Sequence, residues 1–332
     1  MATAGIFAAL KDWWQKRRVA KRAAKLRKAV LDQTLEALIS MTGLSIRAVS
    51  GYEQKLRPAM STALDHINDL VAAIPGPLDI SPQAWNRSPQ VNALFISQTE
   101  MAPLFTRMGE AKKYFAMQRP DENFALLTMD RQDKTVFAVE KQGSLLKRDV
   151  PRTSVTYTNH RLLALAPNQD ETRDLIKMRA LGVLAQVLLE EIKQAKARED
   201  ELAYLENLYK VKLDSMGDWV DDAIPGSEEL RHKPRGAAQM EQALAKVRED
   251  LRRARRARNS NQAHMEALQG IMESAPKMFK ARQHTIYLNE FAMVAKPGSD
   301  EQSNPLTLAR ISLGEDQRRE ALLVRFRQGD FA

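Results

Sequence analysis

Cysteine is missing from this sequence of 332 residues. Disulfide bonds, thiolate nucleophiles and metal sites that need sulfur ligands are therefore excluded, and so is a small secreted scaffold held by disulfides. Aromatic residues amount to only 6% of the chain, and glycine and proline to 14 residues each. Such low contents are unusual for an all-β or α/β enzyme and favour long helices.

Long apolar runs are missing as well. No stretch approaches the roughly 20 apolar residues that cross a bilayer. The mildly apolar residues 1–10 are followed rather than preceded by charges, unlike a secretory signal. We therefore expect a cytoplasmic protein, either free or attached peripherally to a membrane.

Catalytic signatures are the third absence. The sequence has no Gly-x-Ser-x-Gly elbow, no phosphate-binding Gly-x-x-x-x-Gly-Lys loop and no dinucleotide fingerprint. Its only Glu-x-x-His pair, Glu229 and His232, lies in a loop rich in proline and glycine, whereas a di-iron bundle needs two such pairs on helices. His160 with Asp149 remains as a pair that neighbouring strands would have to bring together. We predict no catalytic residue, no cofactor and no metal site.

Positive charge is concentrated in one segment. The chain has a net charge of +9, and residues 11–28 hold nine lysines and arginines against Asp12 alone. That segment therefore carries +8, and all other residues together about +1. Positive charge concentrated in one segment indicates that this segment binds an anionic partner. It does not indicate a protein that is basic over its whole surface.

A helix is predicted from Gly5 to about Met41, with Gly43 as its stop. Its first three turns are amphipathic, and farther along the apolar residues move to a second face. The residues predicted to contact a membrane or another anionic surface are Phe7, Trp13, Trp14, Lys16, Arg17, Arg18, Lys21, Arg22, Lys25, Arg27 and Lys28. An anionic membrane suits this composition. The alternatives are nucleic acid, an acidic protein, or tryptophans packed on the chain itself beside solvated charges.

The middle of the chain predicts a compact core. A second helix over residues 45–74, started or kinked by Pro58, ends in a proline-rich linker. Short helices are expected after Ser88 and Thr99. Strands are expected at 124–129, 135–140, 144–147 and 153–165, with a hairpin turn at residues 130–134. Near the C-terminus, strands at 306–313 and 321–326 and a short helix over 316–325 are equally good alternatives.

Two long helices are predicted between residues 168 and 276. Asn168 and Glu171 form a capping-box-like start, and the apolar stripe continues to about Ser215. The return helix alternates spacings of four and three, with Arg258 and Asn261 as polar interruptions. The predicted seam contains Met240, Leu244, Val247, Leu251, Met265, Leu268 and Met272. An antiparallel coiled-coil hairpin follows from this pattern.

A second basic cluster lies on the return helix. It comprises Arg252, Arg253, Arg255, Arg256 and Arg258. We expect these side chains to pair with acidic residues of the facing helix, such as those near Glu190, Glu191 or Glu199, and nucleic-acid binding is the alternative.

These patterns predict an α+β, predominantly helical fold, in which a long antiparallel coiled-coil hairpin lies beside a small antiparallel β-containing domain. The expected segments are a helical N-terminal region at 1–76, a small α+β domain at 77–167, the hairpin at 168–276 and a C-terminal segment at 277–332. In the strand alternative, the last segment joins the α+β domain.

The predicted function is that of a non-enzymatic scaffold or adaptor. The hairpin would bind protein partners or another copy of the chain, and the basic helix would tether the molecule to an anionic membrane surface. A nucleic-acid-associated protein that uses both basic clusters is the first alternative. An enzyme with its site in the α+β region is the second, and no residue supports it specifically.

Overall fold

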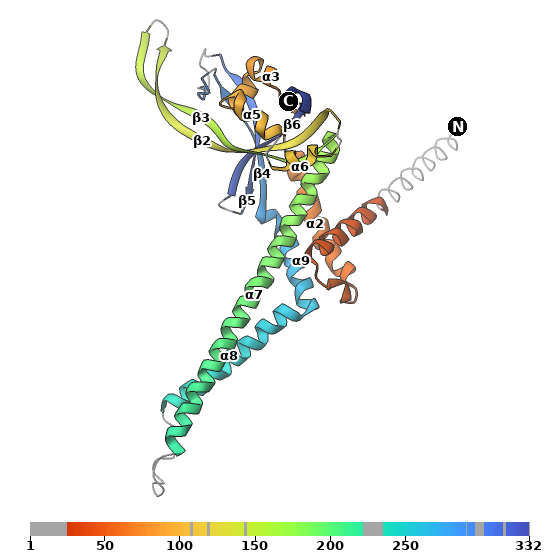
Figure 1. Cartoon of the computed structure of the whole chain (residues 1–332), viewed down its shortest axis with the longest axis vertical. Helices are drawn as coiled ribbons and strands as arrows, with labels where there is room; N and C mark the ends of the chain where they lie inside the picture. The colour runs from red at the N-terminus through yellow and green to blue at the C-terminus, as the bar shows by residue number, and fades with distance from the viewer. Residues whose placement is uncertain are drawn as a thin grey trace, which may run out of the picture. The chain divides into compact units, whose positions relative to one another are not determined.

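The computed structural model describes residues 25–106, 109–117, 120–142, 145–221, 235–289, 291–295, 302–314 and 317–331. Helices and an antiparallel sheet form two compact units (Figure 1). The helical unit combines the chain up to Thr62 with Gly182–Glu273, and the sheet unit combines Ala63–Leu181 with the chain after Ser274. Each unit is thus assembled from stretches that are separated in the sequence.

The helical unit begins, within the described residues, with helical residues 25–42. Gly43 has a φ of +66°, so it ends this helix in the left-handed conformation that glycine adopts freely, as predicted. The next helix, α2 (Tyr52–Ala72), starts later than expected because a 3-10 turn at Ile46–Ala48 and Gly51 at φ +70° precede it. The buried side chains of these helices are Leu31, Leu35, Leu38, Ile39, Ile46, Leu56 and Met60.

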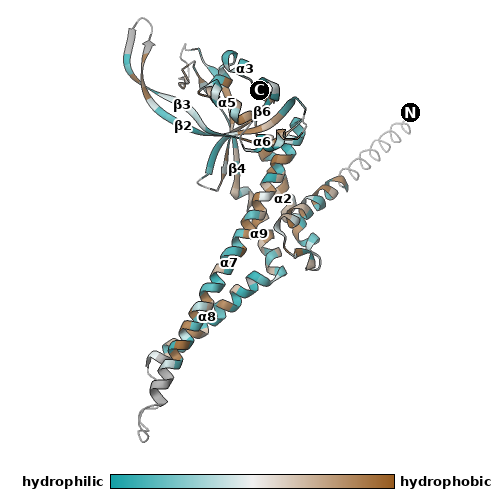
Figure 2. Cartoon of the chain, in the orientation of Figure 1, coloured by the Kyte–Doolittle hydropathy of each residue, from teal (hydrophilic) through white to brown (hydrophobic). Residues whose placement is uncertain are grey.

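The long helix α7 (Gln169–Asp221) starts at the predicted cap. The Asn168 Oδ1 accepts the Glu171 backbone N–H at 2.8 Å, and the Asn168 Nδ2 donates to the Glu171 Oε1 at 2.7 Å. Within the helical unit, α8 (Arg235–Asn259) packs against α7 through a buried cluster of Leu202, Val247, Leu251 and Ala254. Teal predominates along α8, which marks its many polar residues (Figure 2).

The return segment is two helices rather than one. After α8, a new helix α9 (Asn261–Met278) begins beyond Ser260, whose Oγ accepts the Ala263 N–H at 3.3 Å. The His264 Nε2 donates to the Arg258 carbonyl at 2.7 Å and so satisfies a group that the break leaves without its helical partner. The heptad spacing was therefore right about which side chains are buried and wrong about continuity.

The sheet has six strands, which are β1 (Leu78–Asp79), β2 (Glu122–Gln142), β3 (Leu145–Ala166), β4 (Phe279–Leu288), β5 (Asn304–Leu313) and β6 (Gln317–Arg327). Their order is β3-β2-β6-β5-β4, with antiparallel pairing throughout, and β1 pairs with β6 in parallel. Of the two alternatives for the C-terminal region, the structure has the strands.

The turn predicted at residues 130–134 is wrong. Strand β2 runs through it, and Arg131 pairs with Tyr157 of β3. Pairing with β6 stops at Met129, so from Asp130 onward β2 is paired only with β3. Residues 130–134 are polar because both strands of this two-stranded ribbon are exposed to solvent. A turn has a similarly polar composition, so the sequence alone does not distinguish the two.

Four short helices, α3 (Pro82–Arg87), α4 (Pro89–Leu94), α5 (Gln98–Thr106) and α6 (Gly109–Phe115), supply one side of the main core. The Ser88 Oγ accepts the Val91 N–H at 3.4 Å, which confirms the predicted start of α4. In this core Phe105 stacks on Phe331 with ring centroids 4.7 Å apart. The opposite face of the sheet has its own buried cluster around Leu126, Ala321 and Leu323.

Candidate functional site

Of the basic segment at residues 11–28, the structure describes the residues from Lys25 onward. Phe7, Trp13, Trp14, Lys16, Arg17, Arg18, Lys21 and Arg22 lie outside the described residues. Lys25, Arg27 and Lys28 are exposed, and so is every residue from 25 to 30. Leu26 is 68% exposed and Val30 is 45% exposed, whereas the next residue, Leu31, is buried. Among the described residues of this helix, burial therefore begins at Leu31, and Lys25, Arg27 and Lys28 are accessible to solvent.

Nearly all of the predicted seam residues are buried. Leu244, Val247 and Leu251 of α8 are buried, as are Met265, Leu268 and Met272 of α9, and Met240 is half-buried. In α8 the packing partner is α7. The break at Ser260 divides the seam into two helices, so a continuous coiled coil is not what these residues form. Their part in binding another chain stays a prediction.

Glutamates of α7 hold arginines of α8. The Glu199 carboxylate accepts from Arg258 Nη1 at 2.7 Å and from Arg255 Nε at 3.3 Å, and Glu206 accepts from Arg248 Nε at 3.1 Å. The hydrogen bond from Arg258 lowers the pKa of Glu199. The expected pairing of the second basic cluster with the facing helix is confirmed for Arg255 and Arg258. Arg252, Arg253 and Arg256 are exposed, and Arg252 and Arg253 bond to Arg248 and Glu249 of their own helix.

The sequence-derived pair of His160 and Asp149 is wrong. The His160 Nε2 donates to the Leu94 carbonyl at 2.8 Å, and its ring stacks on Phe95 at 4.8 Å. Burial lowers the pKa of His160. This histidine is thus a packed, neutral side chain that fastens α4 to β3. The pair Glu229 and His232 lies outside the described residues.

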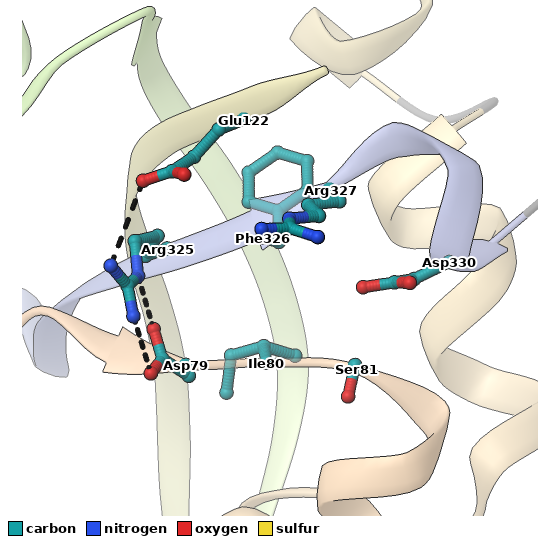
Figure 3. Close-up of a pocket in the computed structure, with 8 residues that line it drawn as sticks. All are labelled: Asp79, Ile80, Ser81, Glu122, Arg325, Phe326, Arg327 and Asp330. Atoms are coloured by element: carbon teal, nitrogen blue, oxygen red, sulfur yellow. Dashed lines mark hydrogen bonds and ion pairs between the residues drawn. The ribbon is translucent and has the colours of Figure 1, made fainter.

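A hollow of about 240 Å³ lies where β1 joins β6 (Figure 3). The guanidinium of Arg325 forms two hydrogen bonds to Asp79, with Nη2 2.7 Å from Oδ2, and lies 3.6 Å from Glu122. This pairing lowers the pKa of Asp79. Since the two groups pair with each other, Arg325 and Asp79 help to hold β1 onto β6.

A second hollow of the sheet unit has a different chemistry, and we name it the arginine pocket. It encloses about 310 Å³ and is lined by Arg131, Asp133, Arg310, Arg318, Arg319 and Glu320. Glu320 is only 2% exposed and directly faces Arg310 on the neighbouring strand. The Arg310 Nε and Nη2 donate to the Glu320 Oε1 at 2.9 and 2.7 Å.

Further polar groups lie around Glu320. The His284 Nε2 of β4 is 3.5 Å from the Glu320 Oε2, and neither atom has a hydrogen-bond partner among the described residues. The hydroxyl of Tyr157 is likewise buried and unpartnered there, and burial raises its pKa. Sequence reasoning missed this cluster because its members come from five strands, and Arg131 and Glu320 are 189 positions apart in the sequence.

Within the described ranges, no group of three or more His, Asp or Glu side chains is placed to hold a metal ion. No helix in the part of the chain that the structure describes is long and apolar enough to span a membrane. Comparison with known protein families, curated proteins and solved structures finds no match.

Proposed function

We propose that this protein is an adaptor that attaches to an anionic membrane surface through its basic N-terminal helix and binds a second protein, or another copy of itself, through α7 and α8. The single observation that carries the proposal is the exposure of every residue from 25 to 30 next to the buried stripe that starts at Leu31. Exposed lysine and arginine beside exposed leucine and valine is the composition that anionic lipid interfaces attract.

Exposed apolar residues of α7 support the second part of the proposal, which is the binding of a protein partner. Tyr204 and Val211 on α7 are 67% and 65% exposed and lie seven residues apart, so they share one side of the helix. Tyr204 lies nearly opposite Leu202, which packs against α8. An apolar side of α7 thus remains available after the helix pair has formed.

Co-sedimentation with vesicles tests the attachment. A triple variant, with Lys25→Gln, Arg27→Gln and Lys28→Gln, should pellet less with phosphatidylserine vesicles. Each removed charge should weaken the free energy of membrane binding by about 1 kcal/mol. The matched control replaces Arg252, Arg253 and Arg256 with glutamine, since these three are exposed on α8 and change the net charge equally. Equal pelleting of both variants, or binding to neutral vesicles as strong as to anionic ones, contradicts the proposal.

Sedimentation velocity tests whether the exposed apolar side of α7 binds another chain. Tyr204→Glu with Val211→Glu should lower the self-association of the chain, or its capture of a partner, because charge replaces exposed apolar surface. The control pair Gln186→Glu with Gln194→Glu adds the same charge at two exposed positions of α7 that lie at least ten residues, or about 15 Å along the helix, before Tyr204. An unchanged mass distribution for the first pair, in a chain that does associate, would remove this side of α7 from the proposal.

A further inference from the structure

The arginine pocket presents guanidinium groups that are already fixed in position. Arg131 donates Nε and Nη2 to Asp133 at 2.6 and 3.0 Å, and Arg310 donates the same two nitrogens to Glu320. Each arginine thus keeps its Nη1 without a hydrogen-bond partner among the described residues. Side chains that are already fixed lose less conformational entropy when they bind a ligand. The free N–H groups of these arginines are therefore preorganised hydrogen-bond donors.

Arg318 adds a third guanidinium at the same pocket. It is exposed, and the described part of the chain gives it no hydrogen bond or ion pair. Arg319, the fourth arginine, is occupied on its other side, because it donates to the Asn159 carbonyl and lies 3.5 Å from Asp130. The lining therefore contains three arginines with donors to spare, and Arg319, whose Nη2 is hydrogen-bonded and whose Nε is buried without a hydrogen-bond partner among the described residues.

Charge in the pocket favours an anion. Four arginines line it against the two carboxylates of Asp133 and Glu320, which leaves an excess of two positive charges. A buried carboxylate costs desolvation energy, and a buried ion pair is weak support for stability. Glu320 also positions the Arg310 guanidinium, and a fixed guanidinium is suited to binding an oxyanion.

We propose that the arginine pocket binds a phosphate group, either as inorganic phosphate or as a phosphate monoester, through the Nη1 groups of Arg131 and Arg310 and the guanidinium of Arg318. Planar guanidinium groups match the oxygens of phosphate in pairs, and charge-assisted hydrogen bonds of this kind are the strong ones. A pocket of about 310 Å³ accommodates a phosphate with part of the molecule that bears it. This site is separate from the basic helix and does not rest on the proposed attachment.

Calorimetric titration of the full chain with inorganic phosphate at low salt tests the proposal. We expect binding to one site with a dissociation constant of about 1 mM or lower. Arg318→Gln should weaken it at least about tenfold, because the exposed side chain supplies donors without supporting the fold. Arg327→Gln is the control, since Arg327 is exposed on the same strand but lines the other hollow. No binding heat, or equal weakening by the two substitutions, overturns the proposal.

Vesicles distinguish a lipid headgroup from free phosphate as the source. If the ligand is a lipid monoester, phosphatidic acid vesicles should pellet the chain better than phosphatidylserine vesicles of equal charge, and Arg318→Gln should remove the difference. If it is a soluble monoester, the titration should show binding while the two vesicle types pellet equally. The variant at Lys25, Arg27 and Lys28 should leave the phosphate titration unchanged, so failure of the membrane proposal and failure of the pocket proposal give different results.

Discussion

Arg310 and Glu320 face each other on neighbouring strands, and both hydrogen bonds from the guanidinium go to one carboxylate oxygen, Oε1. The other oxygen is buried without a hydrogen-bond partner among the described residues. The pair thus couples the stability of the sheet to the geometry of the arginine pocket, and each consequence is measurable.

Removal of Arg310 should destabilise the protein strongly. Arg310→Met leaves the Glu320 carboxylate buried without its main partner, which typically costs about 3–5 kcal/mol. Urea unfolding at neutral pH measures the loss. Arg310→Met combined with Glu320→Met should recover most of it, because no charge then remains buried. Arg282→Met, at the exposed position opposite Arg310 on β4, should change stability by less than about 0.5 kcal/mol.

Stability should fall on acidification because of His160. The folded protein lowers the pKa of this side chain from its ordinary value of 6.5, so the unfolded chain binds the proton more readily. The stabilising contribution is complete above pH 6.5 and is lost as the pH falls through that value toward the lower folded pKa. Unfolding free energies between about pH 8 and pH 5 should therefore decrease more steeply for the wild type than for His160→Gln. Parallel curves would contradict the assignment.

Truncation of Leu251 should loosen the helix pair of the helical unit. This side chain is buried against α7, so Leu251→Ala should cost about 2–5 kcal/mol. Thermal unfolding followed by circular dichroism gives the measurement. Tyr204→Ala, on the exposed side of α7, should have little effect on the melting temperature. A similar shift for both would mean that α7 and α8 do not pack through this cluster.

The cap of α7 should contribute about 1 kcal/mol. Asn168→Ala removes the acceptor of the Glu171 N–H and the donor to its carboxylate, and loss of such a cap typically costs this much. Asn168→Asp keeps the acceptor and should retain most of the stability. Chemical unfolding of the three proteins side by side decides the matter, and an alanine variant as stable as the aspartate variant would show that the cap contributes nothing.

Local signals in the sequence were the dependable ones. The caps at Asn168 and Ser88 and the stop at Gly43 depend on residues no more than a few positions apart, and all three occur as predicted. The break at Ser260 escaped because the heptad spacing reports which face is buried, and the buried face continues across the break. The serine that caps α9 was the available signal.

Long-range features did not follow from sequence patterns. Strand β2 continues through Arg131 because β3 pairs with it over its whole length, and no local residue encodes that partner. The arginine pocket is the same case, since Arg131 meets Arg310 and Glu320 only through the strand order. The hydrogen bond from His160 to the Leu94 carbonyl is a further example, because the two residues lie 66 positions apart in the chain.

The position of β6 has a consequence for the newly made chain. This strand is synthesised last among the described strands, yet it lies in the middle of the sheet between β2 and β5. Until residues 317–327 leave the ribosome, both of those strands keep an open edge whose N–H and C=O groups can pair with a neighbouring chain. The sheet unit therefore closes in a late step, and a chain that stops before β6 should be prone to aggregate while its helices can already form.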